Sequence, residues 1–249
     1  LALGGDGRAS LATMKRIRAL ERELARKEKA LAEAAALLVL DCRLEEAVTL
    51  AQQVLAEPAA PPAAVGWAVF GGVMAAALMG RTAEAAQLVA RGHAVNDKID
   101  ALLRFLLAFG EVRALTLAGD FDGAQARSGD IVRITSPGQY RARAMANVLA
   151  ATVELGRGQL HPATARLEDT VAALDTASAA SWSFPARLLL AQCYCGLGRC
   201  AEAAPLIADL REKVDCGATM FDAPVRLAEA WLAAAEGHLS GAIAAALHA

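Results

Sequence analysis

One short pattern returns along the chain about every 39 residues, and it limits the folds that the sequence can adopt. In each copy an apolar stretch ends at a glycine, which is followed by a small or polar residue and an alanine-rich stretch. A glycine at a helix end can take the left-handed conformation that a Cβ disfavours. The leading glycines are Gly80, Gly119, Gly156, Gly198 and Gly237, and Asp41 stands in the same place one period earlier.

This repeat predicts a series of helical hairpins. Ala, Leu, Glu, Arg and Gln, which favour helices, dominate the sequence, and alternating strand patterns are almost absent. A lone hairpin cannot bury its apolar stripe, so neighbouring hairpins must stack. We therefore expect an all-α fold, a right-handed solenoid of helical hairpins. The expected pairs are 63–79 with 82–95, 99–118 with 121–134, 139–155 with 160–174, 184–196 with 200–214, and 223–236 with 239–249.

Small residues and a few aromatic side chains are expected to fill the core. Alanines near the start of the second helices, such as Ala47, Ala85 and Ala203, would let paired helices approach closely. Only 4% of the residues are aromatic, so Leu, Val and Ala must supply most of the buried surface. The expected larger anchors are Trp67, Phe70, Phe105, Tyr194 and Trp231.

Charge divides the chain into two unequal parts. Residues 1–40 hold eight basic and five acidic side chains, and the remainder holds 17 basic and 22 acidic ones. We expect residues 1–12 to be disordered or frayed, 13–40 to form a charged amphipathic helix, and 41–249 to form the repeat domain. The total charge of −2 gives no general reason to expect a nucleic-acid or membrane-surface partner.

The sequence contains no recognisable catalytic signature. The four histidines are scattered, and no Ser or Cys lies in a nucleophile-elbow pattern. No G-x-x-x-x-G-K-[ST] loop is present to hold a phosphate. We therefore predict that the chain is not an enzyme and has no catalytic, cofactor-binding or metal-binding residues, and no cofactor.

The five cysteines are expected to be free thiols in a reducing, cytoplasmic setting. Their odd number and the lack of a signal-peptide pattern argue against a disulfide framework. Cys193 and Cys195 would point about 200° apart on a helix, so they cannot chelate one zinc ion from a regular helix.

Two further segments bear on the setting of the chain. Residues 63–79 are uncharged, and we expect a buried helix there, with a membrane span as the alternative. The sequence stops within an apolar helical pattern at residues 242–247, so we expect it to be a fragment of a longer protein.

Arginines on the expected first helices are the candidate binding residues. If those helices line the concave face of the solenoid, the arginines could hold an anionic ligand or an acidic partner peptide. The alternative is a solvated surface with ion pairs to Glu111, Glu154 and Glu229. The candidates are Arg104, Arg113, Arg141, Arg143, Arg187 and Arg226.

Residues 189–203 resemble a tetratricopeptide repeat. They hold Leu, Ala and Tyr in the first helix, Leu-Gly-Arg at the turn and Glu-Ala in the second helix, although the period is nearer 39 than 34 residues. Segments 105–115 and 226–237 resemble the helical region of LuxR-family, MalT-like transcriptional regulators. This resemblance, over about residues 41–249, implies a non-enzymatic module that binds a protein or small-molecule effector on its concave face. It implies DNA contact only through domains absent from this chain, and no membrane contact.

Residues 13–40 are similar to a different family. Segments 19–24 and 27–33 resemble the C-terminal helix of the small helix-turn-helix protein of insertion-sequence transposases. The helix-turn-helix itself is missing, and Asp41-Cys42-Arg43-Leu44 enters the repeat pattern instead. The alternative function is thus a transposase-derived DNA-binding remnant fused to helical repeats. A charged helix that caps the first hairpin would explain the same residues.

Overall fold

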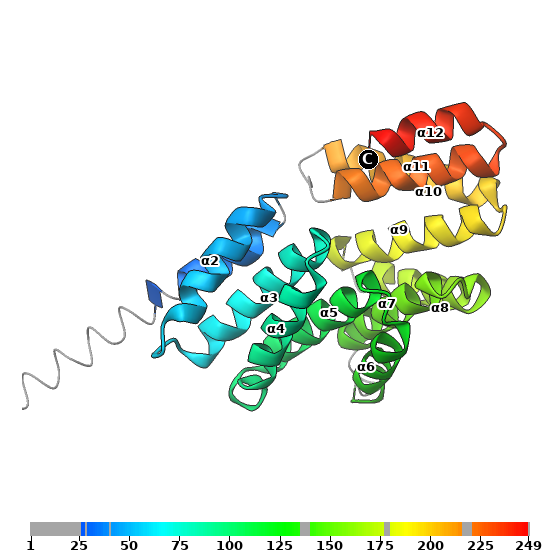
Figure 1. Cartoon of the computed structure of the whole chain (residues 1–249). Helices are drawn as coiled ribbons and strands as arrows, with labels where there is room; N and C mark the ends of the chain where they lie inside the picture. The colour runs from blue at the N-terminus through cyan, green and yellow to red at the C-terminus, as the bar shows by residue number, and fades with distance from the viewer. Residues whose placement is uncertain are drawn as a thin grey trace, which may run out of the picture.

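A computed structural model describes residues 26, 27, 29–39, 41–134, 140–176, 180–215 and 221–248. Within these ranges the chain is helical apart from short connections, and it contains no strand. Residues 29–39 form the first helix (Figure 1). The remaining elements are α2 (Leu44–Ala56), α3 (Pro62–Leu78), α4 (Thr82–His93), the short 3₁₀ helix η1 (Asn96–Lys98), α5 (Ala101–Leu117), α6 (Phe121–Ile134), α7 (Tyr140–Gly156), α8 (Leu160–Thr176), α9 (Ala180–Gly196), α10 (Cys200–Asp215), α11 (Asp222–Ala235) and α12 (Leu239–Leu247).

The helices pair as antiparallel hairpins, which confirms the helical-repeat solenoid. Each pair is joined by a turn whose central residue has a positive φ. In every turn the next backbone N–H donates to the carbonyl five residues earlier, for example from Arg199 to Tyr194 at 2.9 Å. This bond closes a Schellman motif and satisfies a carbonyl at the helix end. The left-handed residues are Cys42, Gly80, Gly119, Gly158, Gly198 and Gly237, spaced 38 to 40 residues apart.

Two of the predicted turn residues are wrong. The third turn uses Gly158 (φ 74°), whereas Gly156 is the last residue of α7. Gly156 is small for a different reason: a Cβ there would lie 2.6 Å from Cε1 of Phe121. In the first turn the left-handed residue is Cys42 (φ 57°) rather than Asp41.

An alanine five residues after each left-handed residue sets the spacing within the hairpins. At this point the second helix faces the first helix of its own hairpin, and a side chain larger than a methyl group would separate them. Five of the six alanines lie in core clusters that also contain residues of neighbouring first helices. All six are buried: Ala47, Ala85, Ala124, Ala163, Ala203 and Ala242.

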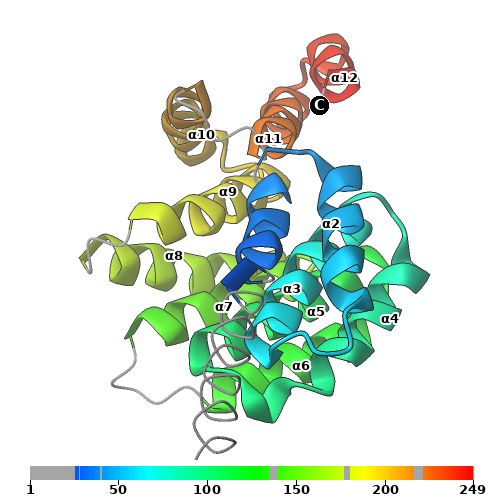
Figure 2. The same cartoon turned by 90° about the vertical axis from the view of Figure 1, so that its left-hand side faces the viewer.

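The first helices form the more closely packed layer. Each of α3, α5, α7 and α9 contacts the first helix of the next hairpin, whereas successive second helices contact one another only marginally. Figure 2 shows α3, α5 and α7 next to one another. Because one layer is packed more closely than the other, the stack curves with its first helices on the inner side.

The N-terminal part of the described chain joins this stack. Ala32, Ala35 and Val39 are buried and belong to the core cluster formed with α2, α3, α4 and α5. Residues 29–39 therefore act as the first helix of the first hairpin. The predicted division of the chain at residue 40 stays a prediction. The part of the charged segment before residue 26 lies outside the described residues.

Helix α3 accounts for the uncharged segment 63–79. It packs between neighbouring helices, and most of its residues are buried. Across the described ranges, no helix has the length and apolar character needed to cross a membrane.

Most of the predicted aromatic anchors pack against the core. Trp67, Phe70, Phe105 and Tyr194 are partly buried against core clusters. Trp231 is the exception, since it is 51% exposed. Trp231 lies on α11, which is the last first helix in the described chain, so no later first helix there packs against its side chain.

Candidate functional site

Glu111 and Arg113, two residues apart on α5, identify the inner face of the stack. The Glu111 carboxylate oxygen Oε2 lies 3.1 Å from Nε2 of His93 on α4 and 2.7 Å from Nε of Arg127 on α6. Glu111 therefore points toward the second helices. Residues two apart on a helix point about 200° apart. Arg113 consequently points to the opposite side, away from the second helices.

The same register recurs on the other first helices. On α11, Glu229 accepts hydrogen bonds from Arg211 of α10, and Trp231 lies two residues later. On α9, Leu190 is buried in a cluster with α8, and Gln192 lies two residues later. We call the residues at this register the inner column: Met74, Arg113, Thr152, Gln192 and Trp231.

Arg113 is the charged member of the inner column. Its side chain is partly buried, and this burial lowers the pKa of its guanidinium below the ordinary value. Among the residues that the structure describes, no carboxylate or carbonyl accepts a hydrogen bond from it. Other partly buried arginines are paired: Arg127 with Glu111, Arg166 with Glu154, and Arg211 with Glu229. A desolvated cation without an acceptor favours an anionic ligand.

Apolar residues share the face of Arg113. Phe109 lies one turn before it on α5 and is partly buried, and Leu117 lies one turn after it and is 46% exposed. On α3, Leu78 occupies the place of Leu117 and is 42% exposed, whereas Met74, in the place of Arg113, is buried. This inner surface thus combines one unpaired cation with exposed apolar side chains, which suits a peptide that carries both a carboxylate and apolar groups.

The other candidate arginines whose side chains the structure describes do not join Arg113 on one surface. Arg187 Nη2 lies 2.7 Å from Asp175 on α8, and Arg226 Nε lies 2.9 Å from Asp222 on its own helix. Arg104 lies two turns before Glu111, on the side that faces the second helices. Arg143 is exposed, and the side chain of Arg141 lies outside the described residues.

The three predicted glutamate partners pair elsewhere. Glu111, Glu154 and Glu229 bind arginines on second helices, namely Arg127, Arg166 and Arg211. These arginines were not among the candidates predicted from the sequence, which all lie on first helices. A signal was present, since Arg127 and Arg166 both lie eight residues after a left-handed glycine.

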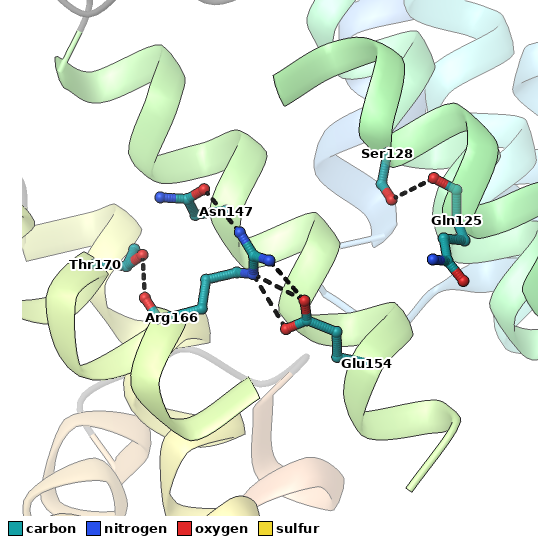
Figure 3. A network of polar contacts seen from close by, with 6 residues as sticks. All are labelled: Gln125, Ser128, Asn147, Glu154, Arg166 and Thr170. Carbon is teal, nitrogen blue, oxygen red and sulfur yellow. Dashed lines mark hydrogen bonds and ion pairs between the residues drawn. The ribbon is translucent and has the colours of Figure 1, made fainter. Parts of the chain in front are cut away.

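The Arg166 contacts show how such a pair joins two helices (Figure 3). Arg166 on α8 donates to Glu154 of α7 through Nε at 3.1 Å and Nη2 at 2.6 Å, and its Nη1 lies 3.5 Å from Asn147 Oδ1. Thr170 and Ser128 donate to the backbone carbonyls of Arg166 and Gln125. This geometry satisfies the polar groups locally and gives the network a structural role.

The cysteines show no sign of a reactive or metal-binding centre in the described chain. Burial raises the pKa of the Cys193 and Cys195 thiols to about 11. No group of three or more His, Cys, Asp or Glu residues within these ranges could hold a metal ion. Cys42, Cys193, Cys195 and Cys200 are free, and Cys216 lies outside the described residues.

A pocket on the outer side of the stack offers few polar groups without a hydrogen-bond partner. It lies between α2 and α4, where Gln52 donates to Glu84 at 2.8 Å and Arg91 donates to the Leu55 carbonyl at 2.6 Å. These polar groups satisfy one another, so Arg113 on the inner side remains the stronger candidate for ligand binding.

Comparison with known proteins supports the class of fold. Two solved structures of a kinesin light chain from Podosopora anserina, described as having nearly identical TPR-like repeats, are similar to this chain. One, a single-substitution variant, is 20% identical with a TM-score of 0.52 and covers 75% of this chain and 93% of its own. The other is 21% identical with a TM-score of 0.51 and covers 75% and 94%. No family model and no curated protein matches the sequence.

The chain therefore has a tetratricopeptide-like helical-repeat fold. The identity to both structures is low, so the likeness concerns the fold and the repeat architecture.

Proposed function

We propose that this chain is a non-enzymatic interaction module whose inner face binds a partner segment. The observation that carries the proposal is Arg113, a partly buried cation without an acceptor among the described residues, set on an apolar inner surface. A partner carboxylate would pair with the Arg113 guanidinium, and apolar partner side chains would cover Leu78 and Leu117. Arginine suits this role because its planar guanidinium can bind a carboxylate bidentately.

The cellular context that we propose is a cytoplasmic transcriptional regulator of the LuxR, MalT-like type. The resemblance of segments 105–115 and 226–237 supports this context. In such a regulator the helical region would receive an effector or a partner, and DNA contact would belong to other domains. Arg141, Arg143, Arg187 and Arg226 remain candidates for secondary contacts with the partner, whereas Arg104 faces the second helices.

Selection from a random peptide library would test the binding role of the inner face. The selected peptides should contain Asp or Glu flanked by apolar residues, because both parts of the surface must be matched. Affinity of the best peptide, measured by fluorescence anisotropy, should fall about tenfold or more for Arg113→Gln, which corresponds to losing one charge-assisted contact.

Arg104→Gln is the matched control. It removes an exposed arginine from the same helix, on the side that faces the second helices, so it should change affinity less than about twofold. Equal losses from both substitutions would show that binding depends on general positive charge. Selected peptides without carboxylates would contradict the role given to Arg113.

A further inference from the structure

The inner side of α5 carries a mostly apolar stripe along the whole helix. Its members follow one another at intervals of three or four residues, so they share one face. Leu102 and Leu117, near the two ends of α5, are 56% and 46% exposed. They are separated by about 22 Å along the helix axis. The stripe consists of Leu102, Leu106, Phe109, Arg113 and Leu117.

Helix α3 widens this stripe into a larger apolar surface. It lies next to α5 (Figure 1), and its inner residues stand at the same register of the repeat. Leu78 is 42% exposed there, and Trp67 and Phe70 are partly buried. Described helices flank the pair on both sides, with α2 against α3 and α7 against α5. The surface therefore lies within the stack and not at one of its ends.

Arg113 is the only charged residue on the inner side of α3 and α5, both of which the structure describes in full. Helix α3 contains no charged residue. The other two charged residues of α5, Arg104 and Glu111, face the second helices. A carboxylate that paired with Arg113 among these apolar residues would be removed from water, which strengthens a charge-assisted hydrogen bond. The surface therefore suits a partner with one acidic group among apolar ones.

The exposed apolar residues are arranged along α5 and not across the stack. Beside Arg113, the equivalent residues of the neighbouring first helices are Met74 on α3 and Thr152 on α7, and both are only 7% exposed. An extended peptide that crossed the first helices at Arg113 would therefore cover little apolar side-chain surface. A helix lying along α5 would cover Leu102 and Leu117 as well as Arg113.

We propose that the partner segment is an amphipathic α-helix of about four turns, which lies along α5 and carries one Asp or Glu within its apolar face. Four turns match the length of the stripe, since one turn rises about 5.4 Å. Apolar side chains at i, i+7 and i+11 of this helix share one face and would cover Leu102 and Leu117. Its carboxylate, at i+4, would accept hydrogen bonds from the Arg113 guanidinium. This inference rests on the proposed function and adds the conformation of the partner.

Binding of two designed peptides to the full chain, measured by fluorescence anisotropy, tests the conformation. The first is an alanine-rich helix of about 20 residues with leucines at i, i+7 and i+11 and a glutamate at i+4. The second differs only by a proline in the middle of its polar face, which breaks the helix but keeps every anchoring side chain. We expect the proline peptide to bind at least about tenfold more weakly.

Substitutions in the protein test the position of the helix on α5. Leu102→Ala and Leu117→Ala should each weaken binding of the first peptide about fivefold, because the helix covers both ends of the stripe. Leu239→Ala, at an exposed leucine on α12, is the matched control and should leave the affinity unchanged.

A double-mutant cycle tests the ion pair. Arg113→Gln in the protein and glutamine for glutamate in the peptide should each weaken binding about tenfold. The two changes together should weaken binding no more than either alone, because they remove the same contact.

Three results would overturn the inference. If library-selected acidic peptides depend on Arg113, but the first peptide binds no better than the proline peptide and Leu102→Ala has no effect, the partner segment is extended and the proposed function stands. If Arg113→Gln weakens no acidic peptide, the proposed function fails as well. If sedimentation shows that the protein alone forms dimers that Leu117→Glu abolishes, a second copy of the chain occupies the surface.

Discussion

Gly71 of α3 lies against the backbone of Ala35. A Cβ at Gly71 would lie 2.8 Å from the Ala35 carbonyl carbon and 2.8 Å from the Ala36 nitrogen. Backbone atoms cannot move aside as the end of a flexible side chain can, so the absence of a side chain at Gly71 sets the distance between the first two hairpins.

Gly71→Ala should therefore lower stability even though alanine favours helices. Helix propensity alone would stabilise the variant by about 1 kcal/mol, but overpacking against a backbone costs about 1–3 kcal/mol. We expect a net loss, measured by urea unfolding. Gly129→Ala on α6 is the control, because its Cβ would meet only the Arg133 guanidinium at 3.5 Å, and it should be neutral or stabilising. A stabilised Gly71→Ala would show that the first two hairpins are packed less closely.

The turn at Gly198 gives a second glycine comparison. A Cβ there would meet no atom within 4 Å, but the φ of 72° is strained for any residue with a side chain. Gly198→Ala should cost on the order of 1 kcal/mol, and the bulkier Gly198→Val about 1–2 kcal/mol. Gly241→Ala on α12 also has open space but no positive φ, so it should stabilise slightly. Equal melting temperatures for Gly198→Ala and wild type would contradict the left-handed turn.

Replacing Arg113 and Arg166 with methionine should have opposite effects on stability. Arg113 has no acceptor among the described residues, so Arg113→Met removes a desolvation cost and should be neutral or stabilising by up to about 1 kcal/mol. Arg166→Met leaves the Glu154 carboxylate partly buried and unpaired, which should cost about 1–3 kcal/mol. Urea unfolding of both variants measures the contrast. A large loss for Arg113→Met would mean that Arg113 has a structural partner.

The cysteines should differ sharply in reactivity. Cys42 is exposed, whereas the Cys193 and Cys195 thiols are buried with pKa values raised to about 11. At pH 8 only about one such thiol in a thousand would be ionised. Labelling with N-ethylmaleimide, followed by mass-spectrometric peptide mapping, should modify Cys42 within minutes and the other two only after unfolding. Rapid labelling of Cys193 in the native protein would contradict its burial.

Burial of the Cys193 thiol makes the free energy of unfolding depend on pH in the alkaline range. The folded state holds the Cys193 proton up to a pKa of about 11, while an exposed thiol has a pKa near 9.0. The contribution of this group is therefore full below pH 9 and is lost as the pH rises toward 11. The urea concentration at the midpoint of unfolding should fall over this pH range, and Cys193→Ala should make it fall less steeply with pH. If the substitution leaves this pH dependence unchanged, groups other than Cys193 cause the loss of stability.

The hairpin repeat could be predicted because its signals are local. A left-handed helix end strongly favours glycine, and four of the turn glycines, including Gly80 and Gly198, are identified correctly from that requirement. The third turn could not be resolved in the same way. Gly156 and Gly158 stand close together, and only the position of Phe121 in space shows that Gly156 serves helix packing instead of the turn.

The candidate site depends on relations that are not local. The sequence gives the helix face of Trp231 but not whether another helix covers it. The sequence also identifies Arg113 as one of six candidate arginines. It does not show the curvature of the helix stack, which places Arg113 on the inner side. The pairing of Glu111 with Arg127 and His93, which defines the inner side, needs three helices in their final positions.

Contacts between neighbouring hairpins have a mechanical consequence. The core clusters each join one hairpin to helices next to it in the chain, and the helix contacts follow the same order. A chain pulled by its two ends would load these junctions in series, so the force would be borne by the weakest junction at any moment. Release of one hairpin of 38 to 40 residues would lengthen the tether by roughly 130 Å, at about 3.3–3.6 Å per residue. Such a protein extends in steps and can give way at one hairpin while the rest still holds.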